Sequence, residues 1–230
     1  MDTVIAGLKS SFLLRTLPAE TIARELLPLG QLREHTRGSH ILNPQEHMDK
    51  LGIVLGGRVQ ILHIFADGSE SLSTVLNPGG VLGSDLIATE SRLAPYHAVA
   101  ATDVRIFYLA AEDLLTPGPL GESTRMEILS RLLTLLSQEN MKKEYRFAIH
   151  SRKGLRERIL TYLTMQANKR GTATITIPFS REEMASYLCV NRSALSHELS
   201  LMARDGLLRF RKNRFTLLHW QPPEGNPAFR

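Results

Sequence analysis

The segment from Pro178 to Leu218 constrains the fold more than any other part of this sequence. Ser180 followed three residues later by Glu183 has the spacing of a capping box, which predicts the start of a short helix. A turn at Cys189–Asn191 follows, and its asparagine is a good N-cap for a second helix. Gly206 is placed to end that helix in the left-handed conformation. The segment therefore predicts two short helices joined by a tight turn.

Helix pairs of this kind place their second helix in the major groove of DNA. The second helix is predicted to begin at Arg192, and its first two turns expose polar side chains that can reach bases or phosphates. The predicted DNA-reading residues are Arg192, Ser193, Ser196 and His197. A helical hairpin without a DNA role is the alternative. The capping box, the small Ala185 at the helix crossing and the apolar Val190 in the turn occur together and favour the DNA-binding unit.

A run of alternating apolar and basic residues, 207–217, follows the helix pair. It predicts a β-hairpin, or wing, that turns at Lys212-Asn213 and exposes a row of cations beside the second helix. Such a wing contacts phosphates, which adds affinity and salt dependence but no sequence preference. The predicted phosphate contacts, one of them at the start of the first helix, are Arg181, Arg209, Arg211, Lys212 and Arg214.

Charge is distributed unevenly along the 230 residues. Residues 1–150 hold 14 Lys and Arg against 17 Asp and Glu, a net charge of −3. Residues 151–230 hold 14 against 6, a net charge of +8. This asymmetry indicates that the C-terminal part meets a polyanion. A basic tail that is simply solvated is the alternative from charge alone.

Several classes of protein are disfavoured by what the sequence lacks. The single cysteine, Cys189, allows no intrachain disulfide and no cysteine-rich metal framework. A signal-peptide layout and an apolar run of about 18 residues are both missing, so we expect a cytoplasmic protein that contacts no membrane. The sequence contains no phosphate-binding glycine loop, nucleophile elbow or His-Glu-x-x-His helix. We therefore expect no enzymatic activity and no catalytic metal.

The spacing of apolar residues along the chain changes near residue 32. Residues 1–30 carry apolar side chains at helical spacing, whereas short apolar runs alternate with turn residues from Leu32 to Leu109. Gly56-Gly57 and Asp67-Gly68 predict two-residue hairpin turns, because such turns need positive φ. Short, regularly spaced strands favour a small antiparallel barrel or sandwich. The expected strands lie at 40–42, 51–55, 59–65, 72–76, 98–100 and 104–109.

A long helix is predicted from Ser123 to His150, followed by an amphipathic helix from Gly154 to Lys169 and a short β run at 173–177. Apolar residues of the long helix recur at alternating steps of four and three, which is a heptad stripe. Two later positions on this stripe, Lys143 and His150, are polar and weaken it. Packing of the helix on its own barrel is the alternative to dimerisation. The predicted dimer-seam residues are Leu129, Leu133, Leu136, Asn140 and Phe147.

The barrel, the long helix and the run FSREEMASYLCVNRSALSHELSLMARDGLLRFRKNRFTLL together resemble the cyclic-AMP receptor protein / fumarate-nitrate reduction regulator (CRP/FNR) family of bacterial transcription regulators. The resemblance covers residues 10–218 and is most specific in the last third. It implies an α+β fold with a cupin-like, antiparallel β-roll of the cyclic-nucleotide-binding type. The implied domains are the β-roll at 1–122, a long dimerisation helix at 123–150, a winged helix-turn-helix at 151–220 and a tail at 221–230.

The resemblance also implies how such a protein acts. It implies a homodimer that reads palindromic operators in double-stranded DNA and responds to an effector in the β-roll, with RNA polymerase as a further candidate partner. The DNA-reading positions of the family fall on Arg192, Ser193, Ser196 and His197. Relatives commonly hold guanine with an Arg at the last position, so His197 changes the expected base preference. Cys189 stands where the family often has Gly, either as a small residue that tolerates the turn or as a thiol switch.

The cyclic-nucleotide pocket of the family uses a Gly-Glu pair for the ribose and an Arg-Ser pair for the phosphate. Here Gly83 is kept, Ser84 replaces the Glu, and Tyr96-His97 replaces the Arg-Ser pair. Cyclic AMP is therefore not the expected effector, because its phosphate loses a bidentate Arg partner. The residues predicted to line the effector pocket are Gly83, Ser84, Asp85, Tyr96, His97 and Leu136.

Other effectors are compared by their chemistry. An iron–sulfur cluster is excluded because it needs several Cys ligands. A small organic effector, aromatic or anionic, between the roll and the long helix is favoured over haem and over a regulator with no effector. A cyclic-nucleotide-binding protein with no DNA role is a further alternative, which the basic wing disfavours. Haem would need a histidine of the roll, and these are His35, His40, His47, His63 and His97.

Overall fold

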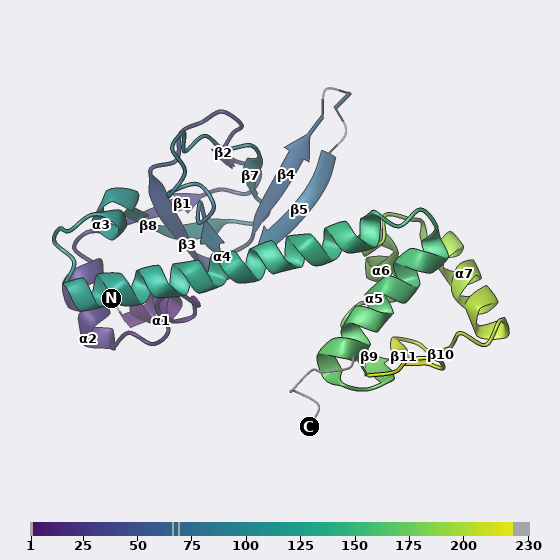
Figure 1. Ribbon diagram of the computed structural model, residues 1–230. Coiled ribbons are helices and arrows are strands. Elements are labelled where there is room, and N and C mark those ends of the chain that lie inside the picture. Colours follow the sequence, from purple (N-terminus) through teal and green to yellow (C-terminus); the bar gives the residue numbers. More distant parts are fainter. Residues whose placement is uncertain (1, 66, 69, 223–230) are drawn as a thin grey trace. The chain divides into compact units, whose positions relative to one another are not determined.

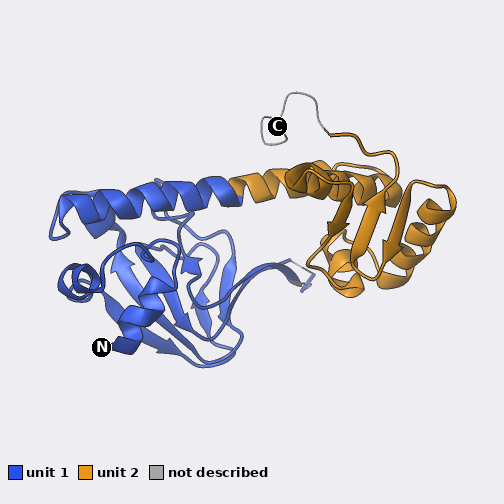
Figure 2. Ribbon diagram, turned by 90° about the horizontal axis from the view of Figure 1, so that it is seen from below, with its two compact units in different colours: residues 1–139 blue, residues 140–230 orange. Residues whose placement is uncertain are grey.

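The computed structural model describes residues 2–65, 67, 68 and 70–222. The chain forms two compact units, residues 1–139 (unit 1) and residues 140–230 (unit 2), and the boundary falls inside the long helix α4 (Glu122–His150) (Figure 2). Of the predicted tail, residues 223–230 lie outside the described residues. Among the described residues, we find no helix that is both long and apolar enough to cross a membrane.

Unit 1 contains two four-stranded antiparallel sheets (Figure 1). The strand order is β1-β8-β3-β6 in the first sheet and β2-β7-β4-β5 in the second. These sheets form the expected antiparallel β-roll. The strands are β1 Gln31–His35, β2 His40–Leu42, β3 Lys50–Gly56, β4 Val59–Ile64, β5 Glu70–Leu76, β6 Val81–Leu82, β7 His97–Ala100 and β8 Val104–Ala110.

Strand β3 helps to build both cores of unit 1. Leu51 and Ile53 pack into a helix-side cluster, whereas Val54 packs into the cluster between the sheets. Successive side chains of a strand point to opposite faces, so one fully buried strand can serve two layers. The helix-side layer is made by α1 (Asp2–Lys9), the π-helical turn η1 (Ile22–Leu26), α3 (Ala111–Leu115) and the first part of α4. The short helix α2 (Ala19–Thr21) leads directly into η1.

One of the two predicted hairpins is confirmed and the other is wrong. Asp67-Gly68 lies between β4 and β5, which pair with each other, and Gly68 has φ +79°. The hairpin is present, but its connection is longer than the predicted two-residue turn, because β4 ends at Ile64 and β5 begins at Glu70. Gly56-Gly57 instead connects strands of different sheets, because β3 pairs with β6 and β8 while β4 pairs with β5 and β7. Gly57 does need its positive φ of +80°, since a Cβ there would lie 2.1 Å from the carbonyl oxygen of Asp103. The same backbone requirement thus serves a crossover between sheets.

Unit 2 is a second, independent core of helices and a small sheet. The sheet has the strand order β10-β11-β9, and Gly171 ends helix α5 in the left-handed conformation with φ +66°. Leu163, Met184, Leu199 and Phe215 are all fully buried in one cluster. The elements are α5 Leu155–Arg170, β9 Thr174–Thr176, α6 Arg181–Tyr187, α7 Arg192–Arg204, β10 Leu208–Arg211 and β11 Arg214–Leu217. The α+β fold and the winged helix-turn-helix are thereby confirmed.

Candidate functional site

The capping box at the start of α6 is present in full. The backbone N–H of Glu183 donates to Oγ of Ser180 at 3.2 Å, and the N–H of Ser180 donates to Oε2 of Glu183 at 2.7 Å. Hydrogen bonds from the backbone N–H and then from the side chain of Ser180 lower the pKa of Glu183 below its usual value. Met184 and Ala185 are buried, as the helix crossing requires. Helix α6, the first helix of the pair, therefore begins and packs as its sequence predicts.

The turn between the helices carries backbone strain at a side chain other than glycine. Cys189 is exposed and has φ +56°, in the left-handed region that residues with a Cβ adopt at a cost. Half-buried Val190 donates its backbone N–H to the carbonyl of Ala185 at 3.0 Å and packs against the core of unit 2. The position therefore needs a residue that accepts positive φ, which explains why glycine would suit it.

Helix α7 buries one face and exposes the predicted DNA-reading face. Oδ1 of Asn191 accepts both the backbone N–H of Ala194 and the hydroxyl of Ser193, each at 2.7 Å. Leu195, Leu199 and Met202 are fully buried beneath the helix. Of the predicted DNA-reading residues, Arg192, Ser193 and His197 are exposed and Ser196 is half-buried. The outward face therefore presents one long cation among short polar side chains.

An ion pair that the sequence did not reveal holds α7 from behind. Nε of Arg156, in α5, lies 2.6 Å from Oε1 of Glu198, and Nη1 lies 2.7 Å from Oδ2 of Asp205. Hydrogen bonds to these two carboxylates raise the pKa of Arg156. Arg156 and Glu198 are 42 residues apart in the sequence, so no local signal could have predicted the pair. Arg156 therefore links α5 both to the middle of α7 and to its C-cap residue, Asp205.

The wing has the predicted alternation. Phe210 and Phe215 face each other across β10 and β11, whereas Arg211 pairs with Arg214 on the opposite face. All four predicted wing cations, Arg209, Arg211, Lys212 and Arg214, are exposed. The fifth predicted phosphate contact, Arg181, is half-buried and touches the underside of the wing.

The predicted dimer seam is only partly available on the surface of α4. Leu133 is 67% exposed and Phe147 is 69% exposed, Asn140 is also exposed, and Leu129 is half-exposed. Leu136 instead packs partly against the helix-side core of unit 1, beside the buried Ile128 and Leu132. Lys143 is exposed, whereas the ring of His150 contacts Tyr187 within unit 2. The helix therefore carries both an inward and an outward apolar stripe.

Two of the predicted effector residues form a direct contact. The hydroxyl of Tyr96 donates to Oδ1 of Asp85 at 2.8 Å. Tyr96 is buried between the sheets, and burial together with the nearby carboxylate raises its pKa. Gly83 has φ +79°, and a Cβ there would lie 2.8 Å from Cε of Met48. Half-buried Ser84 stands between Gly83 and Asp85.

The other two predicted effector residues lie elsewhere. Ala98 and Ala100 of β7 face the core between the sheets, so His97 points to the opposite face of the strand. There its ring contacts His40, with centroids 5.5 Å apart, and its buried Nδ1 has no hydrogen-bond partner. Leu136 packs with the helix-side cluster, as described above. The six predicted residues therefore do not converge on one cavity.

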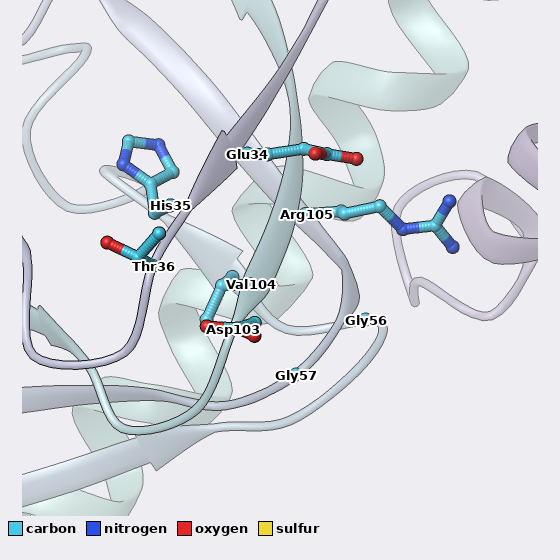
Figure 3. A pocket seen from close by; sticks show the side chains of 8 residues that line it. All are labelled: Glu34, His35, Thr36, Gly56, Gly57, Asp103, Val104 and Arg105. Carbon is cyan, nitrogen blue, oxygen red and sulfur yellow. The ribbon is translucent and has the colours of Figure 1, made fainter.

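A cavity of about 410 Å³ opens at the ends of β1, β3 and β8 (Figure 3). Figure 3 shows Glu34 and Arg105 extending to one side, while His35 points to the other. Oδ1 of Asp103 is already used, because it accepts the backbone N–H of Arg37 at 2.9 Å. The cavity shares no residue with the predicted effector pocket. It is lined by Glu34, His35, Thr36, Gly56, Gly57, Asp103, Val104 and Arg105.

His40 and His97 are in contact with each other, and two other histidines of the roll have different partners. Nε2 of His35 lies 3.3 Å from the hydroxyl of Tyr108, and burial followed by the charge of Arg33 lowers the pKa of His35. His47 lies in an isolated bridge opposite Leu93. Within the described part of the chain, no three His, Cys, Asp or Glu side chains gather into a group that could hold a metal ion.

A β-roll in unit 1, a winged helix-turn-helix in unit 2 and a long helix that spans both define an effector-domain DNA-binding regulator. Comparison with family models agrees: residues 32–116 match the cyclic nucleotide-binding domain, and residues 157–221 match the Crp-like helix-turn-helix domain. The chain belongs to the CRP/FNR family. It is therefore a DNA-binding transcription regulator and not an enzyme.

Individual relatives are distant but similar along most of their length. The transcriptional activator protein FnrL of Cereibacter sphaeroides is 24% identical over 221 residues, covering 89% of this chain and 84% of that protein. The Global nitrogen regulator of Synechococcus elongatus is 23% identical over 209 residues, covering 86% and 92%. The Thermus thermophilus catabolite activator protein shares the fold, with a TM-score of 0.54, 21% identity, and coverage of 90% of this chain and 93% of that one.

Proposed function

We propose that this chain acts as a homodimer that recognises a palindromic operator through α7 and contacts the DNA backbone through its wing. The observation that carries the proposal is the exposure of Arg192, Ser193 and His197 on a capped helix in the same unit as the wing cations. This unit also lies in the part of the chain with a net charge of +8. Such a surface suits a polyanion whose base edges are read by one helix.

Each side chain of α7 has a distinct role in this proposal. Arg192 donates two hydrogen bonds to guanine or binds a phosphate. The hydroxyl hydrogen of Ser193 is used on Asn191, so Ser193 offers a lone pair to the amino group of adenine or cytosine. The side chain of His197 is shorter than that of an Arg and reaches less far toward the bases. Ser196 contacts the DNA backbone or a base edge. Arg209, Arg211, Lys212 and Arg214 neutralise phosphates.

Proteins of this family function as dimers, and we assign the dimer contact to the outward stripe of α4. Leu133, Asn140 and Phe147 are spaced by seven residues, the repeat of a coiled-coil seam. Exposed apolar side chains of this size in a row favour a protein partner. A two-fold dimer would present its recognition helices to half-sites about 34 Å apart. We place this regulator in the cytoplasm, with RNA polymerase as a further partner.

The DNA assignment is tested by selecting an operator from a random duplex library and measuring binding by fluorescence anisotropy. We expect the affinity for the operator to fall steeply as salt rises, and Arg192→Ala to lose at least about tenfold in operator affinity. The affinity of the same variant for a random-sequence duplex should differ much less from that of the wild type. Operator affinity that is independent of salt, or unchanged in Arg192→Ala, contradicts the assignment.

We also propose that a small molecule other than cyclic AMP regulates the protein from the roll, near Gly83, Ser84, Asp85 and Tyr96. The carboxylate of Asp85 supports this, because it is bonded to Tyr96, which stands at the position of the family's phosphate-binding Arg, and a carboxylate there would repel a phosphate. It favours a neutral or cationic effector over an anionic one. Isothermal titration with cyclic AMP should give no binding heat, whereas stoichiometric binding would contradict the proposal. Native mass spectrometry and an absorption spectrum of the purified protein test for retained ligand or haem.

A further inference from the structure

The side chain of Arg181 connects the first helix of the pair to the wing. Its Nη2 donates to the backbone carbonyl of Lys212 at 3.0 Å. Its Cζ lies 5.2 Å from the ring centroid of Phe210 and 5.5 Å from that of Phe215. Those two rings are stacked with centroids 5.9 Å apart. One guanidinium therefore contacts both wing strands and the turn between them.

We propose that Arg181 is a positioning residue that holds the wing in place for DNA, and that it does not itself neutralise a phosphate. The proposal rests on the proposed DNA-binding function. Lys212 has φ +53°, a conformation that residues other than glycine adopt at a cost. The hydrogen bond from Arg181 is made to the carbonyl of this strained residue. It thereby stabilises the turn that presents Lys212 and its neighbours.

The other side of the turn is tied to the segment that leads into α6. Nδ2 of Asn213 donates to the carbonyl of Ile177 at 3.0 Å, and the backbone N–H of Ile177 donates to the carbonyl of Asn213 at 3.0 Å. The wing tip is thus attached both before and at the first residue of α6. Because α6 packs directly on α7, these contacts set the wing relative to the recognition helix.

The surroundings of Arg181 suit a structural contact better than a phosphate contact. Its side chain is half-buried, whereas Arg209, Arg211 and Arg214 are exposed. Burial, followed by repulsion from Arg192, lowers the pKa of Arg181. The aromatic rings are attracted to the guanidinium charge without neutralising it. The cation is therefore retained on the inner side of the wing by π faces and a carbonyl, the two partners that the wing itself supplies.

The first test needs no DNA. Hydrogen–deuterium exchange of the amides of residues 211–214 is compared in the full-length wild type, Arg181→Ala and Arg181→Gln. We expect these amides to exchange about tenfold faster in Arg181→Ala, because the turn opens more often. Arg181→Gln should restore much of the protection, since a neutral amide can still donate to the carbonyl of Lys212. Arg192→Ala is the matched control and should leave exchange in the wing unchanged. Equal exchange in Arg181→Ala and wild type overturns the proposal.

The second test uses a random-sequence duplex of about 40 base pairs and measures how the affinity depends on salt. Loss of one phosphate contact reduces the magnitude of the negative slope of log affinity against log salt by about 0.9, whereas a displaced wing reduces it by about 2 or more. Arg211→Ala should then weaken binding in the wild type and have less than about a twofold effect in Arg181→Ala. A slope change of about 0.9 with additive effects overturns the proposal in favour of a phosphate contact. If the wild type does not bind the duplex, the proposed function fails, while the exchange experiment still decides the role of Arg181.

Discussion

The phenolic hydroxyl of Tyr96 donates a hydrogen bond of 2.8 Å to the carboxylate of Asp85, inside the domain that matches the cyclic nucleotide-binding family model. Tyr96 is buried and Asp85 is exposed, so the bond joins the core of the roll to its surface. Burial and the carboxylate raise the pKa of Tyr96, and the phenol therefore stays a donor at physiological pH.

Replacing Tyr96 by Phe should lower the free energy of unfolding of unit 1 by about 1 kcal/mol, because one hydrogen bond is lost while the ring still packs. Asp85→Asn keeps an acceptor and should cost less. The double variant Tyr96→Phe/Asp85→Ala should cost little more than Asp85→Ala alone. Urea denaturation followed by circular dichroism measures these differences. Strictly additive single effects would contradict a direct contribution of the bond.

The two helix caps of unit 2 should each contribute measurably to stability. We expect Ser180→Ala and Asn191→Ala to lower the free energy of unfolding of unit 2 by about 1 kcal/mol each, because each leaves helix N–H groups without an acceptor. Asn191→Asp retains the acceptor and should be nearly neutral. Ser186→Ala, at an exposed position within α6, is the control. Caps that prove no more sensitive than Ser186 would show that packing alone sets the helix start.

The stability of unit 2 should fall in mild acid because of His150. Burial, followed by the charges of Arg146 and Arg158, lowers the pKa of His150 below 6.5, and a hydrogen bond to the backbone of Tyr187 offsets this in part. The folded chain therefore binds fewer protons than the unfolded chain just below pH 6.5. Stability is full above pH 6.5 and is lost as the pH falls from there through the lowered pKa.

The measurement is the thermal unfolding midpoint of unit 2 between pH 7.5 and 5. We expect His150→Gln to show a smaller fall in this range than the wild type does. His197→Gln, which changes an exposed histidine of the same unit, is the control and should retain the wild-type fall. A fall that is the same in His150→Gln and wild type would assign the acid sensitivity to other groups.

The helix-turn-helix was predictable because its signals are local. Ser180 and Glu183 are three residues apart, as are Asn191 and Ala194, and each pair satisfies helix N–H groups by itself. The ion pair of Arg156 with Glu198 joins elements that only the folded unit brings together. No spacing of residues in the sequence predicts such a contact.

The roll was predicted less well because its signals are ambiguous without the tertiary fold. Gly56-Gly57 indicates positive φ, but only the strand pairing of the folded unit shows that the turn connects two sheets. Strand β1 is mostly exposed and lacks apolar alternation, so it was not expected as a separate strand. The alignment of Tyr96-His97 with one ligand-binding pair could not reveal that neighbouring strand residues face opposite sides.

Two neighbouring leucines of α4 provide the sharpest test of the dimer seam. Leu132 is 4% exposed and packs in the core of unit 1, whereas Leu133 is 67% exposed. Leu132→Ala should lower the free energy of unfolding by about 2–5 kcal/mol, since it leaves a cavity. Leu133→Asp should instead leave the far-UV circular dichroism spectrum unchanged and weaken self-association at least about tenfold, because a carboxylate at the seam loses its water on dimerisation. Sedimentation velocity at micromolar concentrations measures the dimer, and a Leu133→Asp protein that sediments as the wild type does would place the seam on another face of α4.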